Sequence, residues 1–322
     1  MNDPARRERF AAMLRARRFD ETLIANAGLV TGVFHVSIGM EATAAALAGE
    51  RRPGDLITLN HRNHGALAAI GSDPELAYRE ILGRDGGPQR GRAGTLHLAD
   101  AARGVPYTSA MVAGGPALAV GMALARKRLE QDGIVFAFLG DGAFGEGAMH
   151  ESLNLAALWQ LPVLFVCESN AAPAQGRANP MQAARTLHSL AEVHQIPAEA
   201  VDAGDAEAIA KTMAEHSASV RAGGGPSFIE ARTPPWPGNA TFIPALVTGE
   251  LDLREGAGEP SPGWPALDPL LHETRALLAT GTRLDELLEL DGAIAARARD
   301  AFARAAAADP APAQAAFEGV WA

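Results

Sequence analysis

Cysteine is almost absent from this sequence. Its 322 residues include a single cysteine, Cys167, so no disulfide can form within the chain. Cys167 directly continues the apolar run at residues 163–166, which indicates a small, buried hydrophobic side chain in a reducing compartment. Residues 1–7 are polar and lead into an amphipathic pattern, not into the apolar core of a signal peptide. We therefore expect a cytoplasmic protein.

A membrane-spanning segment and a basic cluster are also lacking. Residues 110–125 carry no charge, but this stretch is shorter than the roughly 20 residues that a span needs, and it contains Gly114-Gly115-Pro116. We expect a buried helix with its entry loop there. Lys and Arg total 28 against 38 Asp and Glu, a net charge of −10. Neither a membrane nor nucleic acid is an expected partner, although backbone amides and a metal ion can still bind an anion locally.

Short apolar runs alternate with helical patterns in the middle of the chain. Residues 134–139, 163–168 and 228–232 are apolar nearly throughout, which is typical of strands covered on both faces of a parallel sheet. Helical spacing occupies the segments at 146–159, 186–194 and 205–221. This alternation predicts an α/β fold with a doubly wound parallel sheet.

Helical patterns also flank this region. Residues 8–29, 39–48 and 74–82 read as N-terminal helices, and a Gly/Arg-rich loop follows up to residue 100. A Pro/Gly-rich segment at 234–265 leads to a helical pattern over 267–308. We predict one α/β domain with an N-terminal helical segment over residues 1–265, and a helical tail over 266–322.

The tripeptide Gly140-Asp141-Gly142 follows the first predicted strand directly. Gly-Asp-Gly also forms ordinary turns, but Ser169-Asn170 ends the next strand, beyond residues 143–168. One strand–helix–strand unit fills that gap, so both polar ends meet at the same sheet edge. Mg²⁺ prefers oxygen ligands and keeps few from protein. We predict a magnesium diphosphate site formed by Asp141, Asn170 and a backbone carbonyl, that of Ala172.

Gly140-Asp141-Gly142-Ala143, together with 146–159 and Leu161-Pro162-Val163, resembles the alpha subunit of the first component of 2-oxo acid and acetoin dehydrogenase complexes. The resemblance implies that residues 1–265 bind thiamine diphosphate with Mg²⁺. Segments 17–21 and 34–42 agree with it. Further segments imply cofactor-binding roles for His61, Arg62, Met111, Val112, Gly140, Asp141, Gly142, Ala143 and Asn170, and catalytic roles for His64 and His97. Without the family, a His-rich loop is more often plain surface.

The segment that contains Met111 and Val112 is similar to the one beside the aminopyrimidine ring in acetoin dehydrogenase alpha subunits, which favours acetoin or another acyloin as substrate. Other positions depart from the family pattern. Ser169 replaces the first Asn of an Asn-Asn pair, Pro235 replaces an Arg and Asn239 a His. In the family, that Arg and His flank the diphosphate and the route of acyl transfer.

Three functions remain open. The leading one is an alpha subunit that cleaves a C–C bond next to the carbonyl of an acyloin or 2-oxo acid and passes the unit to a lipoyl carrier held by a lipoyl acyltransferase. The resemblance implies a beta-type partner, most simply in a heterotetramer, that supplies the activating Glu. The second is a lyase or carboligase with a small acceptor, favoured by Pro235 and Asn239. The third is a degenerate scaffolding subunit, which has no need of Asp141 and Asn170.

Overall fold

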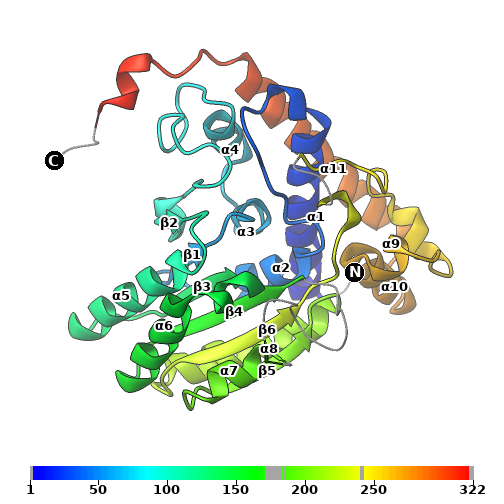
Figure 1. Ribbon diagram of the computed structural model, residues 1–322. Coiled ribbons are helices and arrows are strands. Elements are labelled where there is room, and N and C mark those ends of the chain that lie inside the picture. Colours follow the sequence, from blue (N-terminus) through cyan, green and yellow to red (C-terminus); the bar gives the residue numbers. More distant parts are fainter. Residues whose placement is uncertain (1–2, 171–182, 185, 240–242, 319–322) are drawn as a thin grey trace.

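A single parallel sheet lies at the centre of the structure. The computed structural model describes residues 3–170, 183–184, 186–239 and 243–318. Six strands pair in the order β2-β1-β3-β4-β6-β5, and every neighbouring pair is parallel (Figure 1). The strands are β1 (Leu56–Leu59), β2 (Tyr107–Thr108), β3 (Val135–Gly140), β4 (Val163–Ser169), β5 (Ala198–Asp202) and β6 (Ser227–Arg232). The predicted α/β fold is confirmed.

Side chains of the central strands alternate between two apolar layers. On β3, Val135, Ala137 and Leu139 pack with α5 (Gly114–Arg128), α6 (Gly147–Leu158) and the region of α7 (His188–Glu192). Phe136 and Phe138 point to the other face, where α8 (Ala206–Arg221) and the N-terminal helices cover the sheet. Because both faces are covered, the strands need apolar residues at every position, which is the pattern seen in the sequence.

The N-terminal and C-terminal helices pack on one another. The N-terminal group is α1 (Pro4–Ala25), α2 (Glu41–Glu50), α3 (His64–Ala69) and α4 (Pro74–Ile81). The C-terminal group is α9 (Trp264–Leu267), α10 (Pro269–Ala279) and α11 (Leu284–Ala307), and α11 packs against α1 and α4 (Figure 1). Short 3₁₀ turns lie at Ala27–Leu29, Ala101–Arg103, Asp141–Gly145, Pro237–Asn239, Leu253–Ala257 and Ala313–Ala316. The division at residue 265 stays a prediction.

The helix expected within residues 110–125 is α5, but it is buried on one face only. Ala119, Val120 and Ala123 are buried, whereas Leu118 is exposed. The prediction of a buried helix is therefore right for one face and wrong for the other, because lack of charge does not reveal that one side of a helix faces outward. Among the described residues, no helix combines the length and the apolar character needed to cross a bilayer.

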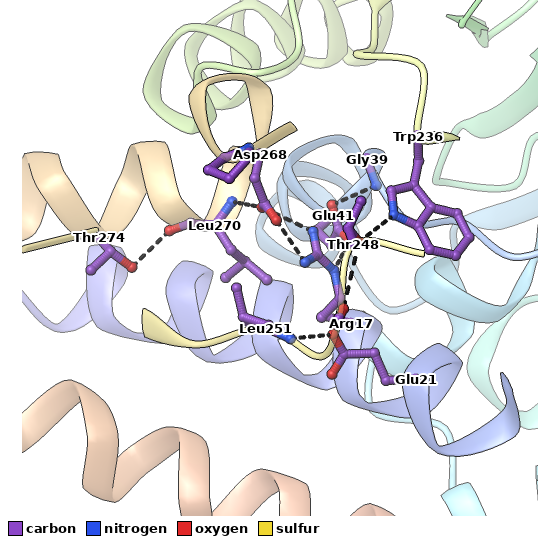
Figure 2. A network of polar contacts seen from close by, with 12 residues as sticks. Arg17, Glu21, Gly39, Glu41, Trp236, Thr248, Leu251, Asp268, Leu270 and Thr274 are labelled. Atoms are coloured by element: carbon purple, nitrogen blue, oxygen red, sulfur yellow. Dashed lines mark hydrogen bonds and ion pairs between the residues drawn. The ribbon is translucent and has the colours of Figure 1, made fainter. Parts of the chain in front are cut away.

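A buried arginine on α1 connects three distant segments. Both terminal nitrogens of Arg17 donate to the carboxylate of Asp268, at 2.8 and 2.9 Å, and its Nε donates to Glu41 Oε1 at 2.6 Å. The backbone N–H of Gly39 donates to the other oxygen of Glu41 at 3.0 Å (Figure 2). Arg17 thereby joins α1 to the start of α2 and to the cap of α10.

Burial acts on the charges of Arg17 and Glu41. It opposes the charge of Arg17, but the carboxylates of Asp268 and Glu41 raise the pKa of Arg17 well above its usual value. Burial also raises the pKa of Glu41 to about 7, against the attraction of Arg17. A buried pair contributes little net stability relative to apolar residues, but removing one partner leaves an uncompensated charge in the core.

Replacing Arg17 with Met should lower the free energy of unfolding by about 3–5 kcal/mol at pH 8, because Glu41 and Asp268 lose their cation. Without Arg17 the pKa of Glu41 rises further above its unfolded value, so the folded variant keeps that proton to higher pH. The loss of stability should therefore grow as pH rises above about 7 and be smaller at pH 6. Urea unfolding at both pH values measures this, with exposed Arg299→Met as the control. Equal losses for the two variants would contradict it.

Candidate active site

A cavity of about 220 Å³ opens at the carboxyl ends of the central strands. β1 has β2 on one side and β3 on the other, so the strand order reverses there. In open α/β sheets the crevice at such a reversal is the usual ligand site. The cavity is lined by Met40, Leu59, Asn60, His61, Arg62, Ser109, Ala110, Met111, Val112, Ala113, Gly115, Pro116, Phe138, Leu139, Gly140, Asp141, Gly142, Ala143, Glu168 and Asn170.

Asp141 and Asn170 reach this cavity from neighbouring strands. β3 and β4 run in parallel register with Gly140 opposite Glu168, so Asp141 and Asn170 come next beyond the ends of the two strands. No atom of the described residues lies within 4 Å of the position that a Cβ would take on Gly140 or Gly142, so the described part of the structure leaves the backbone there open. The predicted meeting of these side chains at one sheet edge is what the structure shows. Ala172, the third predicted ligand, lies outside the described residues.

Arg62 is the one permanent cation among the described lining residues. Its Nη1 donates to the backbone oxygen of Val36 at 2.8 Å, and its backbone N–H donates to Asn60 Oδ1 at 2.7 Å. Burial lowers the pKa of Arg62, and the carboxyl groups of Glu168, Asp20 and Asp141 oppose that shift. The guanidinium therefore remains charged and is held beside the cavity by backbone contacts.

His61 lines the cavity as an uncharged ring. Burial lowers its pKa to about 4, and the nearby Arg62 and His35 act in the same direction. The rings of His35 and His61 meet edge to face, with centroids 4.8 Å apart. At neutral pH His61 thus offers one donor and one acceptor but no charge.

Met111 and Val112 lie at the mouth of the cavity, with exposed fractions of 72% and 56%. They precede α5, whose first turn contributes Gly115 and Pro116 to the lining. The N-terminus of a helix this long favours an anionic group nearby. Two large apolar side chains at an open rim are costly to leave in water, which points to a covering surface.

The structure does not bring His64 and His97 to the cavity lining. His64 is fully buried, with Nδ1 2.9 Å from Asp20 Oδ1, and its Nε2 has no partner among the described residues. His97 is exposed, and its Nδ1 lies 3.3 Å from the backbone oxygen of Thr108. Their catalytic roles stay predictions.

Glu168 is a lining residue that sequence reasoning missed. It is buried at the end of β4, where burial raises its pKa to about 8 in spite of a hydrogen bond from Asn60 and the charge of Arg62. The signal was visible as an acidic residue that ends an otherwise apolar run. Asn60 was missed as well, because β1 is too short for its boundaries to be recognised.

Residues 233–239, which depart from the family pattern at Pro235 and Asn239, form a segment that we call the altered segment. It begins beside the cavity, but none of its residues lines the cavity. The backbone N–H of Thr233 donates to the oxygen of Ser169 at 3.0 Å. Pro235 is exposed, and Oδ1 of Asn239 is buried without a partner among the described residues.

Comparison with known proteins agrees with this geometry. The sequence profile of the dehydrogenase E1 component family matches residues 11–234. The chain belongs to this family. Over 229 residues it is 36% identical to the alpha subunit of an acetoin:2,6-dichlorophenolindophenol oxidoreductase of Bacillus subtilis, covering 70% of this chain and 68% of the relative. It is 31% identical over 297 residues to the alpha subunit of a pyruvate dehydrogenase E1 component of Zymomonas mobilis, covering 91% of this chain and 82% of the relative.

A third relative, an acetoin:2,6-dichlorophenolindophenol oxidoreductase alpha subunit of Cupriavidus necator, is 34% identical over 225 residues, which are 69% of this chain and 68% of the relative. The E1-type alpha subunit predicted from the sequence is thereby confirmed, and with it the thiamine diphosphate-dependent class of enzyme.

Proposed function

We propose that this chain holds the diphosphate end of thiamine diphosphate through Mg²⁺, and that with its beta partner it cleaves the C–C bond of acetoin, a related acyloin or a 2-oxo acid. The observation that carries the proposal is the convergence of Asp141, Asn170 and Arg62 on one cavity at the reversal of strand order. A scaffolding subunit gives no reason for this arrangement.

The donor set of the cavity suits a magnesium diphosphate. Asp141 and Asn170 supply hard oxygen ligands, while phosphate oxygens and water complete an octahedral shell. Arg62 supplies a fixed charge for phosphate oxygens, and the backbone at Gly140 and Gly142 is open to close approach. No group of three or more His, Cys, Asp or Glu side chains within the described ranges could hold a metal instead.

When bound, the cofactor supplies a carbanion that adds to a carbonyl and then accepts the electrons of the cleaved bond. The residues of this chain bind and orient it. Arg62 is fixed by Val36 and Asn60, and His61 stays neutral beside it, so the cavity presents one cation to the phosphates and no second positive charge. Met111 and Val112 border the mouth, where they would exclude water from the reacting end.

The cavity is too small to enclose the whole cofactor. Its volume of about 220 Å³ is below the roughly 300–1,000 Å³ of complete small-molecule sites. We infer that the beta subunit closes it by covering Met111, Val112 and the exposed Leu118 of α5, and that two chains of each kind assemble. The predicted activating Glu then comes from the partner.

The direct test is activity of the chain alone and with its beta-type partner. We expect acetoin cleavage coupled to dichlorophenolindophenol reduction only in the complex, and only with added cofactor and Mg²⁺. Pyruvate and other 2-oxo acids tested in parallel identify the substrate. Robust turnover by the isolated chain would rule out the shared site.

The metal assignment predicts that Asp141→Ala weakens Mg²⁺-dependent cofactor binding at least about 100-fold, since outer-shell partners of metal sites are already worth roughly 10–100-fold. Titration calorimetry of the complex measures this without turnover. Asp132→Ala, at an exposed position between α5 and β3, removes the same charge and serves as control. Unchanged affinity in Asp141→Ala would remove Asp141 from the site.

The altered segment predicts slow transfer to a lipoyl carrier. Pro235 offers neither charge nor donor where an Arg is usual, and Asn239 cannot titrate where a His is usual. Loss of an acid–base group typically costs roughly 10²- to 10⁴-fold in rate. Pro235→Arg with Asn239→His should therefore raise lipoyl acylation far more than dye-coupled cleavage, whereas Pro237→Arg should not. A complex that already acylates a lipoyl domain at the rate of cleavage would contradict this.

A further inference from the structure

A second cavity, of about 1230 Å³, lies among the helices and apart from the candidate active site. Its walls are formed by α1 and by four segments that lie around α1 in Figure 1. These segments are the end of α2, the end of α3, the start of α4, and α11. It shares no lining residue with the first cavity. Six arginines line it, and we call it the arginine cavity: Arg7, Arg9, Arg15, Arg51, Arg103 and Arg297.

The charge of this cavity opposes that of the chain. Only two acidic residues, Glu8 and Glu50, belong to the lining described, in a protein of net charge −10. Glu8 pairs with Arg15 at 2.7 Å, and Glu50 is turned toward Ser217, whose hydroxyl donates to it at 3.0 Å. The lining therefore has a local excess of positive charge.

Of the six arginines, only Arg9 and Arg15 form ion pairs with carboxylates of the described residues, those of Glu207 and Glu8. In the described part of the chain, Arg51, Arg103 and Arg297 form no ion pair with a carboxylate. Nη1 of Arg51 donates to the backbone oxygen of Arg103 at 2.9 Å, which places these two residues side by side. Arg297 approaches from α11, on a different part of the chain.

Buried donors without partners line the same cavity. Nε of Arg9, Nε of Arg15 and Oγ of Ser72 are buried and make no hydrogen bond among the described residues. Leaving a buried donor unpaired costs about 1–3 kcal/mol. Guanidinium groups have donors only, so a ligand of the lining arginines is rich in acceptor oxygens.

Small side chains give the cavity its depth. Its floor includes five buried alanines on α1, α2 and α3, and two larger apolar residues of α11 stand at its side, namely Ala11, Ala12, Ala45, Ala46 and Ala69 with Leu290 and Ile294. The volume exceeds the roughly 300–1,000 Å³ of common small-molecule sites, so a lone inorganic ion would leave most of it unfilled.

We propose that the arginine cavity is a second ligand site, which binds a small organic molecule carrying two or more phosphate groups on an uncharged body. Arg51, Arg103 and Arg297 bind phosphate oxygens by paired N–H donors, as guanidinium groups do. The alanine floor accommodates the uncharged body. A small molecule fits better than an acidic protein segment, because the alanines of the cavity floor are buried, so the ligand enters between the helices instead of lying on the surface.

The test uses ADP as probe and the assembled complex, saturated with thiamine diphosphate and Mg²⁺ so that the cofactor site is filled. Titration calorimetry should show one ADP per alpha chain. Arg51→Gln with Arg297→Gln should weaken binding at least tenfold, because each removes a charged hydrogen-bond donor. The control is Arg52→Gln with Arg299→Gln, which removes the same charge at exposed positions outside the cavity. If the double variant does not fold, the single substitution Arg103→Gln, at an exposed position of the cavity, repeats the test.

Two further results separate this site from the cofactor site. ADP binding should survive in Asp141→Ala, which lacks a predicted magnesium ligand, so the proposal does not stand or fall with the proposed function. Competition between ADP and thiamine diphosphate would overturn it. So would equal weakening by the target and control variants, which indicates unspecific charge attraction. Failure of both ADP and inorganic pyrophosphate to bind the complex would overturn it as well.

Discussion

The hydrogen bonds of the buried Arg17 guanidinium hold in place the N-terminal segments that support the candidate active site. It holds Glu41 at the start of α2, and Glu41 in turn accepts the backbone N–H of Gly39. Three residues earlier, the backbone oxygen of Val36 accepts from Arg62, the cation of the candidate site. One buried arginine thus fixes the segment that holds Arg62 in place.

A carboxylate of α1, that of Asp20, also supports this segment. Asp20 accepts hydrogen bonds from the backbone N–H and the hydroxyl of Ser37, at 2.7 and 2.6 Å, and lies 2.9 Å from His64 Nδ1. His64 starts α3, directly after the loop that carries His61 and Arg62. His64 therefore helps to hold this loop in place through its contact with Asp20. Together Arg17 and Asp20 make α1 the support of a site to which it contributes no lining residue.

How far the sequence predicts this structure depends on the range of the interactions involved. Strands β3, β4 and β6 were predicted because burial on both faces demands a continuous apolar run, and Asp141 and Asn170 followed from their places at strand ends. β5 was missed because it lies at the sheet edge and its residues are mostly part-exposed, so the apolar signal is lost. The partners of Arg17 lie 24 and 251 positions away, and no local periodicity encodes such pairs. From the sequence alone, only the family resemblance of residues 17–21 indicates that the segment around Arg17 is important.

The two proposed sites would bind anions in two different ways within one acidic protein. In the proposed function a single cation, Arg62, lies near Asp141 in the candidate active site, so charge balance with a diphosphate would depend on a divalent metal. Binding of the diphosphate would then be conditional on Mg²⁺. The arginine cavity carries its own excess of positive charge and needs no metal.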